Sequence, residues 1–231
     1  MIFGLFSYDW TILLVIPGFI ISVWAQIKVQ TTFEKYSKMR TSRGMTGYMA
    51  ARKILDENGL FYVNIEQVRG HLSDHYDPRT CVIRLSDEVY HSSSPAAIGV
   101  AAHEAGHALQ YAKGYAPIKL RSALVNVTSF GSMMAIPLFF IGLIAAYEPL
   151  MLAGIVLYSA IAFFQLVTLP VEFNASRRAL ATLESFSILT SDELRGARSV
   201  LSSAAMTYVA ALASSLLSLL RLIVLANNRR R

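Results

Sequence analysis

Four long segments with almost no charge constrain this chain more than any other feature of its sequence. They run from about Trp10 to Ile27, Leu124 to Tyr147, Leu150 to Leu169 and Met206 to Leu225. A helix that spans a bilayer needs about 20 mostly apolar residues, because the hydrocarbon core is about 30 Å thick. Hydrophobic residues make up 54% of the 231 residues and the mean hydropathy is +0.45, so we predict a mostly α-helical, multi-pass membrane protein.

These segments divide the sequence into several parts. The second and third are separated only by Tyr147-Glu148-Pro149, which predicts a tight helical hairpin. No lysine or arginine precedes the first segment, so we expect a retained anchor and not a cleaved signal peptide. The predicted parts are an N-terminal transmembrane anchor (1–28), a polar region (29–122), the transmembrane hairpin (123–169), a second polar stretch (170–205) and a C-terminal hydrophobic helix with a basic tail (206–231).

Basic residues predict the orientation of the chain in the cell membrane. Residues 28–121 carry 13 of the 21 lysines and arginines, and cytoplasmic loops are enriched in these residues. We therefore expect both polar stretches to face the cytoplasm. If all the segments crossed, Arg229-Arg230-Arg231 would lie outside, so the topology of the last segment stays open. The net charge of +6 does not indicate a nucleic-acid partner, because the basic residues lie beside apolar segments.

The polar stretches show a small α+β pattern. Apolar spacing predicts a helix over Thr46–Asn58 that ends at Gly59. Ser94 and Pro95 are typical of a helix start, and a capping box at 190–193 opens a helix that continues into the last apolar segment. The other expected elements are strands over Leu60–Ile65 and Thr80–Leu85, a loop over His71–Pro78 and a helix from Pro95 to about Ala112.

The helix that begins at Ser94 contains the motif His103-Glu104-x-x-His107. Residues four apart lie on one helix face, so both imidazoles can bind one metal ion while Glu104 serves as a general base. The alternative is that these are ordinary polar residues on a cytoplasmic helix. The surrounding residues are small or apolar, and a buried His-Glu-His cluster without a partner would be costly, so we favour a zinc site.

A catalytic zinc ion usually has a third protein ligand and one open position. The best candidate is Glu172, which follows the third apolar segment, with Pro170 expected to start a new helix there. On that helix Ser176 lies four residues further and could orient a ligand. Alternatively, Glu172 is a solvated carboxylate favoured by the helix dipole.

Taken together, HEAGHALQ, the hairpin and VEFNASRRAL resemble the YugP-type family of neutral zinc metallopeptidases of prokaryotic membranes. The chain is also similar to the HtpX and CAAX prenyl protease group, whose third ligand is a glutamate that begins an E-x-x-A-D motif. Here this motif starts at Glu172 and ends with Ser176 in place of aspartate. The resemblance implies a gluzincin-like cytoplasmic part, one Zn²⁺ per chain and a location in the prokaryotic plasma membrane.

Several other residues are candidates for supporting roles. His75 or Tyr76 could donate to the oxyanion, and Arg177 could bind substrate or anchor the chain at the membrane interface. His71 and His75 are four apart, but their loop is not expected to be helical, so we predict no second metal site there. The strand Thr80–Leu85 is either a sheet edge that holds an extended peptide or an ordinary core strand.

The sequence therefore predicts an integral-membrane zinc metalloendopeptidase whose active site faces the cytoplasm. Its expected partners are the lipid bilayer and a polypeptide substrate associated with the membrane, and an oligomer or a regulatory membrane partner stays open. The alternative is a membrane scaffold or partner-binding protein with a structural zinc ion, which would need a fourth protein ligand. A transporter is disfavoured, because Glu148 and Arg221 lie at segment ends.

Overall fold

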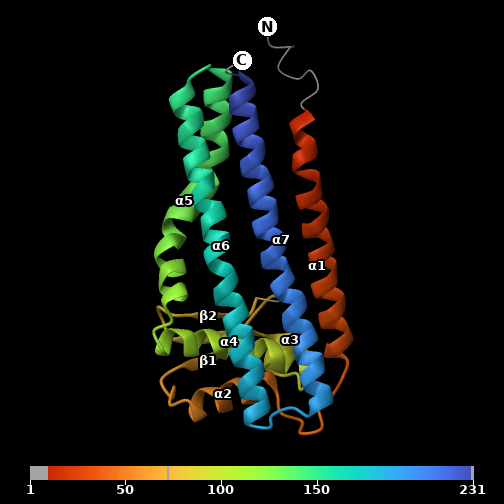
Figure 1. Cartoon of the computed structure of the whole chain (residues 1–231). Coiled ribbons are helices and arrows are strands. Elements are labelled where there is room, and N and C mark those ends of the chain that lie inside the picture. The colour runs from red at the N-terminus through yellow and green to blue at the C-terminus, as the bar shows by residue number, and fades with distance from the viewer. Residues whose placement is uncertain (1–9, 72, 230–231) are drawn as a thin grey trace. The chain divides into compact units, whose positions relative to one another are not determined.

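A computed structural model describes residues 10–71 and 73–229 of the chain. Figure 1 shows the helices and strands of the chain. The chain forms two compact units, each held together mainly by contacts within itself. We call residues 10–25, 120–169 and 207–229 the apolar unit, and residues 26–119 and 170–206 the polar unit. The helices are η2 (Trp10–Leu14), α1 (Ile16–Ser37), α2 (Gly47–Glu57), α3 (Asp87–Tyr90), α4 (Pro95–Ala112), α5 (Ala116–Ile144), α6 (Glu148–Ser185) and α7 (Ser191–Arg229). The strands are β1 (Asn64–Val68), β2 (His75–Asp77) and β3 (Val82–Ser86).

The apolar unit contains the four segments that the sequence predicts to be membrane helices. Within the described residues, the helices long and apolar enough to cross a bilayer are Trp10–Ser37, Ala116–Ile144, Glu148–Ser185 and Ser191–Arg229. Glycine permits close helix contacts in this unit, since a Cβ added at Gly154 would lie 2.7 Å from the Phe139 Cβ. Ser22 and Ser214 also share a hydrogen bond of 2.9 Å between their hydroxyl groups. Small and hydroxylated residues at such contacts are typical of helices that pack in membranes.

The polar unit contains a three-stranded sheet with the order β1-β3-β2. β1 runs parallel to β3, with Asn64 opposite Val82, and β2 runs antiparallel to β3, with Tyr76 opposite Ile83. β3 is therefore the central strand and β2 an edge strand. The predicted strand Thr80–Leu85 thus corresponds to a core strand and does not form the edge that could bind a peptide.

The predicted strand over Leu60–Ile65 is wrong for its first four residues, because the chain from Leu60 to Val63 forms a turn and β1 begins only at Asn64. The Leu60 amide donates to the Leu55 carbonyl at 2.9 Å, which closes the end of α2. The Arg52 guanidinium then donates to the carbonyls of Leu60 and Val63 at 3.0 and 2.7 Å. These bonds satisfy backbone groups that a strand would pair with its neighbour.

Three further features differ from the prediction. β3 begins at Val82 because Cys81 has a positive φ of 54° and Asp77 accepts hydrogen bonds from Arg79 and Thr80. The loop predicted over His71–Pro78 contains the short strand β2. Pro170 does not start a helix but lies inside α6. A proline can remain within a long helix at the loss of one backbone hydrogen bond, when neighbouring groups satisfy the freed carbonyl.

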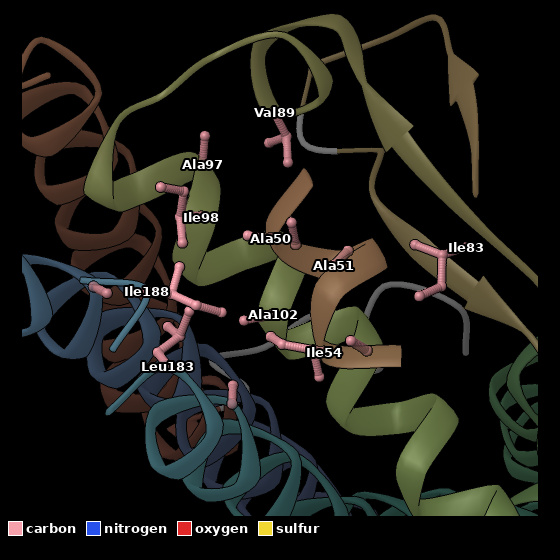
Figure 2. Close-up of a cluster of buried hydrophobic side chains, with 14 of the residues drawn as sticks. Ala50, Ala51, Ile54, Ile83, Val89, Ala97, Ile98, Ala102, Leu183 and Ile188 are labelled. Carbon is pink, nitrogen blue, oxygen red and sulfur yellow. The ribbon is translucent and has the colours of Figure 1, made fainter. Parts of the chain in front are cut away.

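The end of α2 at Gly59 and the starts of α4 and α7 confirm the capping signals of the sequence. Thr46 accepts from the Met49 amide at the start of α2, and Ser94 accepts from the Ala97 amide at the start of α4. α4 packs against α2 and contacts α3 and β2. Figure 2 shows the resulting core, in which residues of α2 face Ile98 and Ala102 of α4, with Ile83 of β3 and Leu183 of α6 nearby. This packing holds α4, the helix with the two histidines, inside the polar unit.

Candidate metal centre

Within the polar unit, α4 and the second half of α6 supply the polar side chains of the candidate centre. The glycine inside the His-Glu-x-x-His motif allows them to approach closely. A Cβ added at Gly106 would lie 2.7 Å from the Ala175 carbonyl oxygen, which is shorter than such a contact tolerates. Ala175 follows Glu172 on α6, so this contact holds the proposed third ligand beside the histidines.

His103, His107 and Glu172 converge at this contact. His103 Nε2 lies 3.2 Å from Glu172 Oε2, and His107 Nε2 lies 3.5 Å from the same oxygen. The two imidazole rings are nearly perpendicular, at an interplanar angle of 87°. The Glu172 side chain is only 2% exposed, so its charge depends on the two imidazoles and not on solvent.

The spacing of these ligand atoms fits a zinc ion. Two ligands bonded to one tetrahedral zinc ion at about 2.0–2.2 Å lie about 3.3–3.6 Å apart, close to the distances from the carboxylate to the imidazoles. In the described part of the chain, these three residues form a group that could hold a metal ion, because their ligand atoms all lie within 4.8 Å of one another. Three protein ligands of this kind are typical of catalytic zinc, which keeps a fourth position open.

Each histidine has a second partner at its other ring nitrogen. His103 Nδ1 lies 3.1 Å from the Ser176 hydroxyl, and His107 Nδ1 lies 3.0 Å from Gln110 Oε1. Partners of this kind orient metal-ligating imidazoles and leave Nε2 free to bind. The sequence analysis singled out Ser176 but missed Gln110. The signal was present, since Gln110 follows His107 by three residues, one helical turn, in an otherwise apolar stretch.

Glu104 lies next to the ligands and is itself buried. Its carboxylate accepts a hydrogen bond from the backbone N–H of Tyr76 in the edge strand β2. Burial raises the pKa of the Glu104 carboxyl from its ordinary value to about 7, while the neighbouring His103 opposes the shift and the negative charges of Glu172 and Asp74 add to it. A carboxyl group with a pKa near neutrality is suited to accept and return a proton.

Comparisons with known proteins show the family of the chain. The sequence profile of a family described as "Putative neutral zinc metallopeptidase" matches residues 11–227. The chain is also 49% identical over 219 residues to the "Putative membrane protease YugP" of Bacillus subtilis (strain 168), an alignment that covers 95% of this chain and 97% of that protein. The chain belongs to this zinc metallopeptidase family. No solved structure matches it.

Membership of the zinc metallopeptidase family implies a zinc cofactor and a polypeptide substrate. His103, His107 and Glu172 are the described residues that could hold the metal. The relative in Bacillus subtilis is named as a membrane protease, and this chain has four helices that could span a bilayer. Both findings support a location in a membrane.

The other candidates of the sequence analysis lie in different surroundings. His75 is exposed and bonds through Nδ1 to the Ser73 carbonyl. The Tyr76 ring lies 5.7 Å from the Tyr111 ring of α4, and burial raises the pKa of its hydroxyl. Arg177 is exposed on α6.

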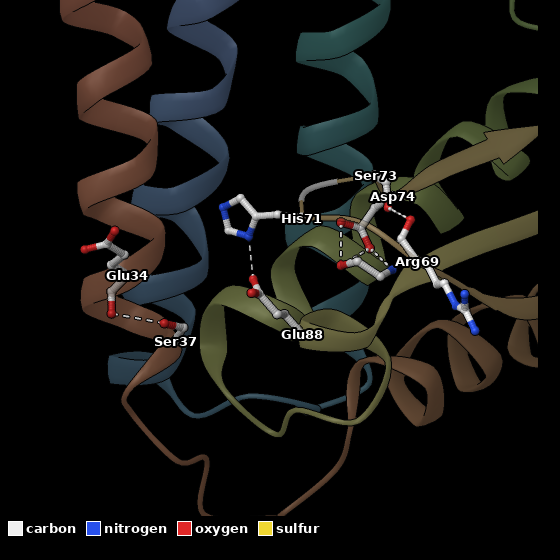
Figure 3. Close-up of polar contacts among 8 residues, drawn as sticks. Glu34, Ser37, Arg69, His71, Ser73, Asp74 and Glu88 are labelled. Carbon is white, nitrogen blue, oxygen red and sulfur yellow. Dashed lines mark hydrogen bonds and ion pairs between the residues drawn. The ribbon is translucent and has the colours of Figure 1, made fainter.

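His71 forms a hydrogen bond outside the candidate centre. Its Nδ1 lies 2.7 Å from Glu88 Oε2, as Figure 3 shows. Its ring also contacts Phe33 edge-on, with 6.1 Å between the ring centroids. His71 and His75 therefore have separate partners.

Proposed function

We propose that this protein is an integral-membrane zinc metalloendopeptidase in which Glu104 is the general base. The observation that carries the proposal is the spacing of His103, His107 and Glu172, which suits tetrahedral zinc beside a buried glutamate. A zinc ion bound there would polarise the scissile carbonyl and lower the pKa of water from about 15.7 to about 7.

Glu104 carries out the proton transfers in this mechanism. Its carboxylate takes the proton of the attacking water and later delivers it to the nitrogen of the leaving amine. The hydrogen bond from the Tyr76 N–H holds the carboxylate in place during these steps. Glu172 is buried beside both imidazoles and serves as a ligand, so the two glutamates have separate roles.

The edge strand β2 is the proposed binding surface for the polypeptide substrate. It contacts α4 and pairs with β3 on one side only. An extended peptide can add to such an edge through backbone hydrogen bonds, which recognise main chain of any sequence. Since the Tyr76 N–H donates to Glu104, this edge lies directly beside the base.

Tyr76, His75 and Arg177 are the candidates for stabilising the oxyanion or binding the substrate. Tyr76 is the strongest of them, because its backbone already reaches Glu104. Its raised pKa keeps the hydroxyl protonated, as a hydrogen-bond donor requires. We place Ser176 behind His103 as the residue that orients this ligand.

The proposal also locates the active site on the cytoplasmic side of the plasma membrane. It rests on the 13 lysines and arginines of residues 28–121 and on the positive-inside rule. Accessibility labelling of Cys81, the single cysteine of the chain, in intact and permeabilised cells would test this orientation. Labelling that requires permeabilisation is expected, whereas equal labelling of intact cells would place the polar unit outside.

The Glu104→Gln variant tests the mechanism. It removes the base but keeps a hydrogen-bond acceptor for the Tyr76 N–H, so we expect bound zinc to remain and peptide cleavage to fall by about 10²- to 10⁴-fold. The matched control is Glu88→Gln, which changes an exposed carboxylate paired with His71. Cleavage that survives in Glu104→Gln would remove Glu104 as the base. A wild-type protein that binds zinc but cleaves no peptide would favour a scaffold with structural zinc.

A further inference from the structure

We propose that Gln110 is a positioning residue that fixes His107 in the tautomer whose Nε2 can bind the metal. The inference rests on the proposed zinc site, since it concerns one of its ligands. Gln110 is fully buried in α4 and its amide contacts both His107 and the helix α6. A chain of hydrogen bonds that starts at Arg178 determines which way this amide points.

The direction of each bond follows from which groups can donate. The guanidinium of Arg178 can only donate, and its Nε lies 2.7 Å from Asn174 Oδ1. Asn174 therefore presents its oxygen at this position. Gln110 Nε2 lies 3.0 Å from the same oxygen and 2.8 Å from the Val171 carbonyl oxygen. Both neighbours are acceptors, so the NH₂ group of Gln110 must face α6.

This orientation leaves the Gln110 oxygen for His107. Gln110 Oε1 lies 3.0 Å from His107 Nδ1, and an amide oxygen can only accept. The proton must therefore be on Nδ1, so in the neutral imidazole that binds a metal the lone pair is on Nε2, the nitrogen that faces Glu172. Because the Arg178 guanidinium can only donate, it orients the Asn174 amide and then the Gln110 amide, which determines where His107 carries its proton. The Arg178 side chain also lies over the Tyr115 ring.

The same side chain also connects the two helices that supply the ligands. Val171 and Asn174, the two partners of the Gln110 NH₂ group, lie on either side of Glu172 in the sequence of α6. A shift of α6 relative to α4 would break these bonds. Gln110 therefore acts on His107 directly and on Glu172 through the helix that carries it.

His103 has a less specific partner. The Ser176 hydroxyl, 3.1 Å from His103 Nδ1, can rotate to donate or to accept, so it does not impose a tautomer. The two ligands are thus held differently, with a fixed acceptor behind His107 and an adaptable hydroxyl behind His103. Loss of the Gln110 amide should accordingly affect zinc affinity more than loss of the Ser176 hydroxyl.

The test compares zinc dissociation constants of the purified full-length protein, measured by competition with a chelator. Gln110→Met keeps the size of the side chain and removes the acceptor, and we expect zinc to bind about 10- to 100-fold more weakly. Gln110→Glu keeps an acceptor for His107 Nδ1 but loses the donor to Val171 and Asn174, so its zinc affinity should lie between those of Gln110→Met and the wild type. The matched control is Ser203→Ala, a buried hydroxyl of α7 that bonds only within its own helix.

The outcomes separate this inference from the proposed function. Wild-type affinity in Gln110→Met, or equal losses in Gln110→Met and Gln110→Glu, would overturn the role of Gln110 while leaving the zinc peptidase in place. A wild-type chain that binds no zinc would overturn both. If a Gln110 variant fails to fold, Asn174→Leu decides, because it removes the acceptor that orients the Gln110 amide. It should weaken zinc binding several-fold, and unchanged affinity would contradict the hydrogen-bond chain.

Discussion

In the polar unit, large apolar side chains such as Ile54 and Ile83 are completely buried, whereas Phe19 and Val156 of the apolar unit are 71% and 67% exposed. The polar unit therefore has the core of a water-soluble domain, with apolar residues inside. The apolar unit has a smaller buried cluster around Phe139 and Met151 and presents apolar side chains outward. Such exposed surface is stable only where lipid covers it.

The two units also differ in their buried ionisable groups. Glu104 and Glu172 are both less than 10% exposed in the polar unit. Their burial costs free energy, which hydrogen bonds and opposite charges must offset. Such groups are maintained where they have a function. The comparison supports placing the proposed chemistry in the polar unit and the membrane-spanning segments in the apolar unit.

The largest effect that would test this comparison is a charge placed on an exposed apolar position. We expect Val156→Lys, in the middle of the third apolar segment, to disfavour membrane insertion by about 2.5–3.5 kcal/mol. Met49→Lys is the matched change in the polar unit, where Met49 is 52% exposed. It should change the stability by less than about 0.5 kcal/mol. The two variants are compared by the fraction of protein that integrates into membranes. Equal fractions for Val156→Lys and Met49→Lys would contradict the assignment of the two units.

The sequence was sufficient to predict the features that depend on local patterns. Apolar length predicted the four candidate spans, Ser94 predicted where α4 begins, and Gly59 predicted where α2 ends. The i, i+4 spacing placed His103 and His107 on one face of a helix, as the structure has them. Each of these signals lies within a few residues of its effect.

Features that depend on contacts distant in the sequence could not be predicted in this way. The turn at 60–63 exists because Arg52, on the preceding helix, binds two carbonyl groups of that segment. Pro170 stays inside α6 although its sequence context is typical of a helix start. The contacts of Gln110 with Val171 and Asn174 join residues about 60 positions apart, so only the folded chain reveals them.

A smaller effect is expected where a glycine lies between helices. Gly106→Ala would place a Cβ 2.7 Å from the Ala175 carbonyl oxygen, so we expect a loss of about 1–3 kcal/mol in stability and weaker zinc binding. Gly131→Ala in the apolar unit is the control, because its Cβ would find its nearest neighbour at 3.4 Å. There the higher helix propensity of alanine should make the change neutral or stabilising. Thermal unfolding of the two variants would measure the difference, and a stable Gly106→Ala protein would show that α4 and α6 can separate without cost.

The smallest expected effect concerns the pH dependence of the polar unit. Asp74 accepts hydrogen bonds from the Ser86 amide and hydroxyl, but burial outweighs them and raises the pKa of its carboxyl above the ordinary value. A carboxyl whose pKa is higher in the folded than in the unfolded state favours folding at low pH, and this contribution is lost as the pH rises through the folded pKa. Asp74→Asn keeps an acceptor for the Ser86 amide and removes the charge.

We therefore expect Asp74→Asn to gain stability relative to the wild type as the pH rises from acid towards neutral. The Asp74 charge also raises the pKa of Glu104, so its removal should move the acidic limb of the cleavage profile to lower pH. Glu57→Gln, an exposed carboxylate on α2, is the control for both measurements. If Asp74→Asn changes the stability equally at all pH values, the pKa of the Asp74 carboxyl is the same in the folded and unfolded states. If the pH dependence of cleavage does not shift, water or the bound metal screens the Asp74 charge from Glu104.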